Sequence, residues 1–239
     1  FGLENLALIP GSVGAAPIQN IGAYGVEIAQ FIESVSVIDA NQTARDIAAS
    51  DCAFAYRDSV FKARLAASDQ ALIILGVTFR LPLRANVNLA YAELAEAFEL
   101  DAAKAGKQKR HAPAPLQVAA AVMAIRRKKL PDPGEYANAG SFFKNPVIDA
   151  STAQRLQVRS VTPYRFAQGY KVSAAQLMDL AGWKGARSGD VGCWPKQPLV
   201  LVNYGQASAE HLLGFAQEIQ RSIAERFEIQ LELEPSIVS

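Results

Sequence analysis

The chain has 239 residues, half of them apolar, which is enough to bury a sizeable core in one or two domains. Its 24 basic and 23 acidic residues nearly cancel and are well mixed, so the composition argues against nucleic-acid or anionic-lipid binding over a broad surface. The two cysteines, Cys52 and Cys193, give neither a metal-ligand spacing nor a disulfide framework, and they fit a reducing cytoplasm. The longest apolar stretch, around residues 71–77, is too short to span a bilayer, and we expect a soluble, cytoplasmic protein.

The first half of the chain predicts a mixture of helices and strands. Residues 9–24 carry three glycines and two prolines, a composition that suits irregular backbone close to a ligand, although an ordinary tight turn has the same composition. Residues 34–39 and 71–81 predict strands, and residues 51–62 predict a short helix followed by a loop. Helical spacing over 88–100 precedes a polar connector, 101–115, where we place the domain boundary, giving domains 1–115 and 116–239.

The second half predicts four helices and two strands. Pro115 opens a helix that ends in the basic run 126–129, and short capped helices follow over 151–156 and 173–181. Residues 199–203 predict a strand, and apolar residues on one face predict a helix over 208–227. The alternation of Phe227, Ile229, Leu231 and Leu233 then predicts a terminal strand. The order of elements favours an α+β fold.

Two polar segments could carry chemistry. Arg57, in Tyr56-Arg-Asp-Ser-Val-Phe-Lys62, offers a planar, permanently charged guanidinium that can hold a carboxylate, although a surface pair with Asp58 is the simpler interpretation. Ser141, in Asn138-Ala-Gly-Ser-Phe-Phe-Lys-Asn-Pro146, has no triad partner nearby in the sequence, and from the local sequence alone a structural turn serine is the simpler interpretation.

These segments, together with Gly2–Glu27, resemble the UDP-N-acetylenolpyruvoylglucosamine reductase (MurB) family over the whole chain. The resemblance implies the second half of a PCMH-type FAD-binding domain, followed by a MurB-type substrate-binding domain. It implies an NADPH-dependent, FAD-mediated oxidoreductase that reduces UDP-N-acetylglucosamine enolpyruvate to UDP-N-acetylmuramate for peptidoglycan synthesis. We expect it to act as a monomer, without a metal.

The resemblance also implies roles for individual residues. The catalytic residues would be Arg57, holding the substrate carboxylate, Ser141, the proton donor to carbon, and Glu234, a carboxylate that assists. The flavin would contact Pro10, Gly11, Val13, Gly14, Ala15, Ile18, Asn20, Gly22, Ala23, Tyr24 and Arg57. The substrate would contact Tyr91, Arg126, Lys129, Lys144, Asn145, Tyr164, Lys184 and Gln197.

The sequence departs from the family in three places. The family's Leu-Glu-Pro-Glu-Val stands here as Leu231-Glu-Leu-Glu-Pro-Ser-Ile, so that either Glu234 or Ser236 could occupy the functional position. We prefer Glu234, because a slip within a strand would turn every side chain to the opposite face. Ala175-Gln176 replaces a usual Gly-Trp, and Trp194 stands where a histidine is common.

The family's first third has no counterpart in this sequence, which begins at Phe1 and lacks the glycine-serine-asparagine phosphate loop. We therefore expect an incomplete flavin-binding domain. Two alternatives stay open: a fragment that binds a UDP-sugar without catalysis, and another flavin oxidoreductase with the same kind of FAD-binding domain.

Overall fold

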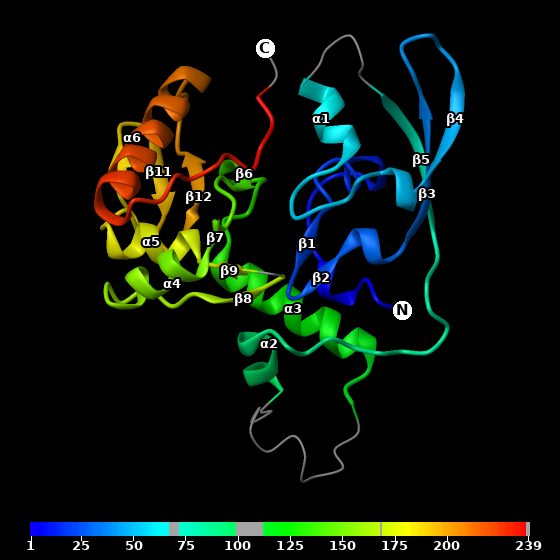
Figure 1. Ribbon diagram of the computed structural model, residues 1–239, viewed down its shortest axis with the longest axis horizontal. Coiled ribbons are helices and arrows are strands. Elements are labelled where there is room, and N and C mark those ends of the chain that lie inside the picture. Colours follow the sequence, from blue (N-terminus) through cyan, green and yellow to red (C-terminus); the bar gives the residue numbers. More distant parts are fainter. Residues whose placement is uncertain (67–71, 99–111, 168, 238–239) are drawn as a thin grey trace. The chain divides into compact units, whose positions relative to one another are not determined.

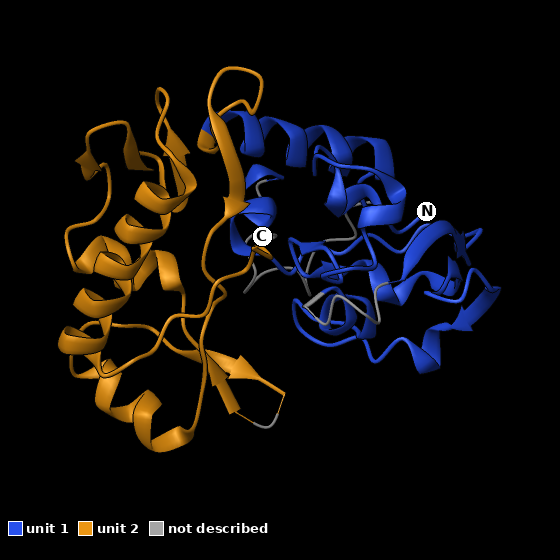
Figure 2. Cartoon of the chain, turned by 90° about the horizontal axis from the view of Figure 1, so that it is seen from above, with its two compact units in different colours: residues 1–128 blue, residues 129–239 orange. Residues whose placement is uncertain are grey.

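The computed structural model describes residues 1–66, 72–98, 112–167 and 169–237 (Figure 1). These residues divide into two compact units, Phe1–Lys128 and Lys129–Ser239, which Figure 2 shows in blue and orange. Both units combine helices with antiparallel sheets, so the predicted α+β class is confirmed. The domain boundary between residues 115 and 116 stays a prediction.

Unit 1 contains a three-stranded antiparallel sheet in the order β4-β3-β5. The central strand β3 (Ile32–Ile38) pairs with β4 (Ala44–Ala48) and β5 (Ile73–Phe79), and a two-stranded hairpin joins β1 (Gly22–Ala23) to β2 (Val26–Glu27). The remaining elements are the helices α1 (Val60–Ala66), α2 (Ala92–Ala97) and α3 (Pro115–Lys129) and the 3-10 turns η1 (Glu4–Leu6), η2 (Val13–Ala15), η3 (Ile28–Gln30) and η4 (Ala49–Asp51).

Two separate apolar clusters hold unit 1 together. Alternation along β3 turns Val35 and Val37 to the inner face of the sheet, where both are fully buried. On α3, Val118, Val122 and Ile125 follow one another at helical spacing and pack with Leu94 of α2. Partly buried Tyr24 and Leu89 contact this second cluster. The glycine-rich loop that contains Tyr24 is therefore anchored to α2 and α3 by apolar packing.

Unit 2 contains two antiparallel sheets and three helices of its own. The larger sheet has the order β10-β11-β12-β6, formed by Arg187–Ser188, Val191–Trp194, Gln197–Asn203 and Ala137–Ser141. The smaller has the order β7-β9-β8, formed by Val147–Ile148, Gly169–Lys171 and Tyr164–Phe166. The helices are α4 (Ala150–Gln157), α5 (Ala174–Leu180) and α6 (Ala209–Phe227), capped by the side chains of Asp149, Ser173 and Ser208.

Helices α5 and α6 cover one face of the larger sheet. Cys193, Leu199 and Leu201 point from β11 and β12 into the core with Ile219 and Phe227 of α6. Because side chains alternate along a strand, Gly192, Val200 and Val202 lie on the opposite face. Paired residues of neighbouring strands share a face, so Ser141, which pairs with Val200, also lies on this face, away from α5 and α6. We call this the outer face of the larger sheet.

Most predicted elements are confirmed, and the errors have local causes. The helix expected within 51–62 is wrong: η4 ends at Asp51, and α1 begins at Val60, after the Ser59 hydroxyl accepts hydrogen bonds from the first turn. The terminal strand is an extended segment with one bridge, Phe143 to Leu233, because only residues 142–144 face it. Most of the predicted connector 101–115 lies outside the described residues.

No helix among the described residues has both the length and the apolar character needed to cross a membrane.

Ile219→Ala should destabilise unit 2, because Ile219 is fully buried on α6 and its truncation leaves a cavity in the main core. We expect a loss of about 2–5 kcal/mol in the free energy of unfolding. Both tryptophans, Trp183 and Trp194, lie in unit 2, so urea unfolding followed by tryptophan fluorescence reports on this unit. The exposed neighbour Glu218→Ala is the control and should change stability by less than about 0.5 kcal/mol.

Candidate functional site

The serine motif is held between strand β12 and the terminal segment of the chain. The Phe142 backbone N–H donates to the Leu199 carbonyl at 2.8 Å, which continues the pairing of β6 with β12. On the other side, the Lys144 N–H donates to the Glu232 carbonyl at 2.9 Å, and the Glu234 N–H donates to the Phe142 carbonyl at 3.0 Å. Residues 142–144 and 232–234 thus form a short antiparallel ladder, which we call the terminal ladder.

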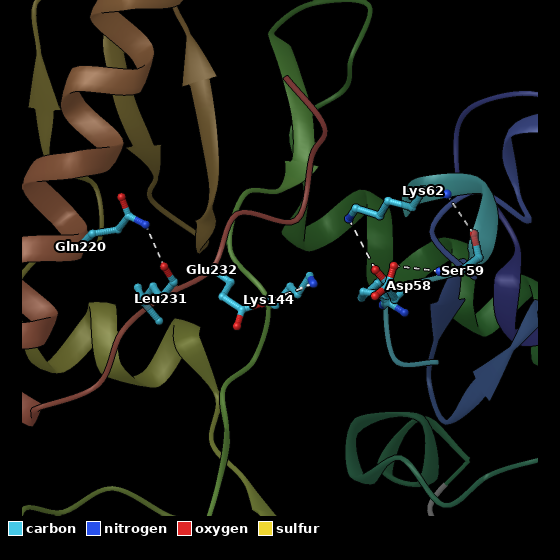
Figure 3. A network of polar contacts seen from close by, with 8 residues as sticks. Asp58, Ser59, Lys62, Lys144, Gln220, Leu231 and Glu232 are labelled. Atoms are coloured by element: carbon cyan, nitrogen blue, oxygen red, sulfur yellow. Dashed lines mark hydrogen bonds and ion pairs between the residues drawn. The ribbon is translucent and has the colours of Figure 1, made fainter. Parts of the chain in front are cut away.

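Side-chain contacts support the terminal ladder. Phe142 and Phe143 are both buried and meet edge to face, with ring centroids 5.6 Å apart. The Lys144 ammonium lies 3.4 Å from the Glu232 carboxylate, and the Gln220 amide of α6 donates to the Leu231 carbonyl at 2.7 Å (Figure 3). The position of the terminal segment is therefore fixed both by its partner residues and by α6.

The terminal ladder places Glu234 next to the serine motif. Leu231 and Leu233 pack on the main core, so Glu232 and Glu234 point to the opposite side of the segment. Residues 232–234 oppose 144–142 without a bulge, whereas Ser236 is exposed and lies two residues beyond the last of these hydrogen bonds. Glu234 is partly buried, one residue across the ladder from Ser141. The pairing without a bulge fits the register that the sequence analysis preferred, and the functional role of Glu234 stays a prediction.

Ser141 ends strand β6 on the outer face of the larger sheet. The preceding Gly140 has φ +73, a backbone conformation that glycine adopts without strain. Within the described residues the Ser141 hydroxyl makes no hydrogen bond, and its side chain is only partly exposed. A partly sheltered hydroxyl without an internal partner is free to donate to a bound ligand.

The other predicted substrate residues of unit 2 lie on several elements, and one of them, Lys184, is held in an ion pair within the protein. Asn145 belongs to the serine motif, and its side-chain oxygen accepts from the Ala174 N–H at the start of α5. Gln197 begins β12 and pairs with Trp194. Tyr164 lies on β8 and is 47% exposed, and Lys129 is the last residue of α3. Lys184 differs, because it follows α5 and forms an ion pair with Asp179 of that helix at 3.0 Å.

In unit 1, Arg57 is turned toward the glycine-rich loop. Its backbone has φ +55, and its guanidinium donates to the Gly22 carbonyl. A Cβ atom at position 22 would lie 2.9 Å from the guanidinium, so the glycine permits this approach. The Asp58 carboxylate instead accepts from the Ser59 backbone N–H at 2.9 Å. The guanidinium is therefore held against the loop, and the Asp58 carboxylate is engaged at the start of α1.

Buried polar side chains connect the glycine-rich loop to the Arg57 segment. Asn20, only 1% exposed, donates to the Ala55 carbonyl and to Glu27, and accepts from the Ala29 N–H. Ser59, also 1% exposed, donates to the Ile18 carbonyl and caps α1 by accepting from Phe61 and Lys62. Figure 3 shows the bond from Lys62. Residues 18–22 and 55–59, which lie about 37 positions apart in the sequence, thus form one polar assembly.

The start of the glycine-rich loop presents its backbone amides outward. Pro10, Gly11, Val13 and Ala15 are exposed, and Gly14 is partly exposed. The consecutive N–H groups of residues 11–14 form no hydrogen bond within the described part of the chain. Successive free amides in a turn create a concave, partly positive surface that suits an anion such as a phosphate. Ala23 and Tyr24 follow in and after β1.

Three of the predicted site residues meet on the second core of unit 1. The rings of Tyr24 and Tyr91 pack edge to face, with centroids 5.0 Å apart. Burial, with smaller effects of Glu93 and Tyr91, raises the pKa of Tyr24 to about 12, although Arg126 opposes this shift. Burial also lowers the pKa of the Arg126 guanidinium, and its Nε is buried without a hydrogen-bond partner among the described residues. Tyr24 is therefore a neutral donor near neutral pH.

Other chemistry has little support in the described residues. They contain no group of three or more His, Cys, Asp or Glu side chains that could hold a metal ion. Cys52 and Cys193 are buried, and burial raises their pKa values to about 11 and about 12, so neither is a thiolate near neutral pH. An open hollow of about 520 Å³ beside α6 contains none of the predicted site residues; it is lined by Gln217, Gln220, Arg221, Ala224 and Gln230.

The sequence analysis assigned no role to Asn5, although it connects three parts of unit 1. Asn5 is 1% exposed and donates to the carbonyls of Tyr24 and Asn88 at 2.8 and 2.9 Å. Its sequence signal, one asparagine beside Glu4 in a short 3-10 turn, is too weak to indicate these distant partners.

Comparison with known proteins agrees with this architecture. Residues 132–238 match the family described as UDP-N-acetylenolpyruvoylglucosamine reductase, C-terminal domain. Over 99% of its length the chain is 47% identical to the UDP-N-acetylenolpyruvoylglucosamine reductase of Pseudomonas savastanoi pv. phaseolicola and 48% identical to that of Ralstonia nicotianae, covering 68% of each. A crystal structure of the Thermus caldophilus enzyme (MurB) matches 99% of the chain at 25% identity with a TM-score of 0.60, and the chain covers 64% of it.

The chain is thus an α+β protein built like the reductases of cell-wall precursor synthesis. It belongs to the UDP-N-acetylenolpyruvoylglucosamine reductase family, whose members are oxidoreductases, and the predicted family is confirmed. The chain spans about two thirds of the length of these relatives.

Asn20→Ala should loosen the connection between the glycine-rich loop and the Arg57 segment. It removes a buried donor and acceptor with three partners and should destabilise unit 1 by about 2–4 kcal/mol. Hydrogen exchange read by mass spectrometry should show faster exchange at residues 15–29 and 52–62, with unit 2 unchanged. Asn41→Ala, at an exposed turn where only the backbone bonds, is the control. Equal exchange in both variants would refute the connecting role of Asn20.

Proposed function

We propose that this chain carries the active-site segments of a reductase that converts UDP-N-acetylglucosamine enolpyruvate to UDP-N-acetylmuramate, using FAD and NADPH, in peptidoglycan precursor synthesis. The observation that carries the proposal is the terminal ladder, which pairs Glu234 with Phe142, the residue after Ser141, within one unit. The names of the relatives supply the substrate class. FAD, NADPH, the residue roles, a monomeric state and a cytoplasmic location belong to the proposal.

The glycine-rich loop and Arg57 fit a flavin. The free amides of residues 11–14 suit the pyrophosphate of FAD, and Ile18, Asn20 and Gly22 shape the backbone behind them. When bound, FAD reduced by NADPH would supply the hydride for the enolpyruvyl double bond. The loop amides bind anions without carrying net charge, so they hold the cofactor without competing with Arg57 for the substrate carboxylate.

Ser141 would donate a proton to the carbon next to the substrate carboxylate. Its hydroxyl has no partner among the described residues, and it lies on a face that helices α5 and α6 do not cover. A serine is a weak acid in water, but a hydroxyl held in hydrogen-bond reach of a strongly basic carbanion can transfer its proton. The rigid backbone on both sides of Ser141 would keep that distance short.

Arg57 would bind the substrate carboxylate, where negative charge grows during the reaction. A guanidinium stays protonated at every working pH and can form two parallel hydrogen bonds to a carboxylate. Fixed positive charge at the position of a developing enolate is among the largest contributions to catalysis. The Gly22 carbonyl already orients this guanidinium, so little reorganisation is needed when the substrate binds.

Glu234 would orient the reacting groups from the other side of the serine motif. Its backbone is fixed by the hydrogen bond to Phe142, and Leu233 on the core prevents rotation of the segment. The aromatic and basic residues Tyr91, Arg126, Lys129, Lys144, Asn145, Tyr164, Lys184 and Gln197 would hold the UDP-sugar. Lys184 would have to leave Asp179 or share its charge with the ligand.

A second function has a specific observation in its favour. The family model for the C-terminal domain matches residues 132–238, nearly all of unit 2, which favours binding of the UDP-sugar by unit 2 without a flavin. Titration of the purified chain with FAD separates the two functions, because bound flavin shifts and sharpens its visible absorption. Binding of FAD supports the reductase, and UDP-sugar binding without FAD supports the second function.

Ser141→Ala should separate the two half-reactions in the flavin-bound protein. Flavin reduction by NADPH should keep the wild-type rate, whereas formation of UDP-N-acetylmuramate should fall by at least about 10³-fold, because the proton donor is lost. Rapid-mixing absorption follows the flavin, and chromatography follows the product. Ser151→Ala is the control. It removes an exposed hydroxyl in the first turn of α4 and should leave both rates unchanged. If Ser141→Ala slowed both half-reactions together, the proton-donor role would be wrong.

A further inference from the structure

The outer face of the larger sheet in unit 2 carries an aromatic cluster that the proposed mechanism does not use. The Tyr136 ring lies 5.3 Å from the Trp194 ring and 5.8 Å from the Tyr204 ring, measured between centroids. The Arg187 guanidinium stacks on the Tyr204 ring at 4.2 Å. None of these residues belongs to the apolar core that lies beneath α5 and α6. We call Tyr136, Trp194, Tyr204 and Arg187 the outer aromatic cluster.

Glycine 192 allows the outer aromatic cluster to lie against the strands. A Cβ atom at Gly192 would come within 2.8 Å of the Ala186 carbonyl oxygen and 3.2 Å of the Tyr204 ring. The ring therefore packs directly over the backbone of β11. The rings of the outer aromatic cluster therefore contact both one another and the backbone of the sheet.

Trp194 ends β11 with a hydrogen-bond donor that has no acceptor. Its Nε1 is buried, and it makes no hydrogen bond in the described parts of the chain. The other tryptophan of this chain behaves differently, because the Trp183 Nε1 donates to the Ser222 hydroxyl at 3.0 Å. Buried polar groups in folded proteins are nearly always paired, so an unpaired one needs an explanation, and a partner from outside the chain is one such explanation.

The position of Trp194 indicates what that partner is. Trp194 is opposite Gln197, a proposed substrate contact, at a tight hairpin turn where the register of β11 and β12 becomes irregular. Its ring contacts Tyr136, which contacts Tyr204 above Gly192, so the indole lies on the outer face of the sheet. Ser141 lies on the same outer face, two strands away. The indole N–H is thus on the face where the substrate would lie.

We propose that Trp194 is a substrate-binding residue whose indole N–H donates to an acceptor oxygen of the nucleoside diphosphate part of the substrate. The proposal rests on the proposed function, since that function supplies a UDP-sugar as the ligand. A diphosphate oxygen and a uracil carbonyl both accept such a bond, and the Tyr136 ring beside the indole closes the position from one side.

The test compares two tryptophan-to-phenylalanine variants of the 239-residue chain, because each removes one indole N–H. Isothermal titration calorimetry measures the Kd for UDP, UMP and uridine, and thermal unfolding measures the Tm. Trp194→Phe should raise the Kd for UDP about 10-fold and leave the Tm unchanged or slightly raised, since no internal hydrogen bond is lost. Trp183→Phe should leave the Kd unchanged and lower the Tm by about 2–4 °C, since its bond to Ser222 is lost.

Two further measurements sharpen the result. Trp183→Phe leaves Trp194 as the single fluorophore, so its emission should change on addition of UDP. Trp194→His, which keeps a ring N–H, should recover part of the affinity. A weaker Kd for uridine in Trp194→Phe assigns the bond to the uracil, and a weaker Kd for UDP alone assigns it to the phosphates.

Equal Kd values for wild-type and Trp194→Phe protein would overturn the proposal while leaving the proposed function intact. Equal losses of affinity in both phenylalanine variants would also overturn it, because they would show a structural effect. If the wild-type chain bound none of the three probes, the UDP-sugar assignment itself would fail together with the role of Trp194.

Discussion

The terminal ladder is the interaction on which the arrangement of unit 2 depends. Its three residues on each side join the chain's last described segment to the serine motif, and they leave no choice of register. Leu231 and Leu233 must face the core, because turning them outward would expose two large apolar side chains. Once these leucines are placed, the alternation of an extended chain fixes Glu234 on the side away from the core. A hydrophobic constraint thus positions a carboxylate.

In unit 1, buried hydrogen bonds help to fix the path of the glycine-rich loop. Its glycine-rich loop packs Ala16 and Ile18 on one apolar cluster and Tyr24 on the other. Buried Asn5, Asn20 and Ser59 add hydrogen bonds to carbonyl groups far along the chain. Each of these bonds would leave a buried polar group unsatisfied if the loop moved, which costs about 1–3 kcal/mol per group. The loop can therefore keep its outward amides free while its inner side is fixed.

The long helices and the strands could be predicted from the sequence, because their patterns are local. The spacing of Phe215, Ile219, Ile223 and Phe227 defines α6, and the serines before α5 and α6 cap them as expected. The start of α1 could not be predicted, because it depends on the Ser59 hydroxyl, which also bonds to Ile18 in the loop. The terminal strand was overestimated for the same kind of reason, since a strand needs a partner as well as a pattern.

In the candidate site, too, some features follow from local sequence patterns and others from contacts between distant residues. The motifs around Arg57 and Ser141 could be identified by their resemblance to a family, and the alternation of leucines indicated which glutamate to choose. The outward turn of the loop amides, the bond of Arg57 to Gly22 and the unpaired indole of Trp194 arise from contacts between distant residues. No local pattern encodes such contacts, so only the folded chain reveals them.

Two buried donors without acceptors, Arg126 Nε in unit 1 and Trp194 Nε1 in unit 2, are the only such side-chain atoms among the described residues. Both belong to residues with a proposed role toward the UDP-sugar, whereas the buried Asn5, Asn20 and Trp183 are fully engaged in structure. A fold selected for stability alone would pair or remove such donors, because each costs about 1–3 kcal/mol. A bound ligand that accepts hydrogen bonds from these donors removes this cost. Unpaired donors therefore lower the stability of the free protein and raise its affinity for the ligand. Unpaired donors at these two residues therefore fit a binding role for both side chains.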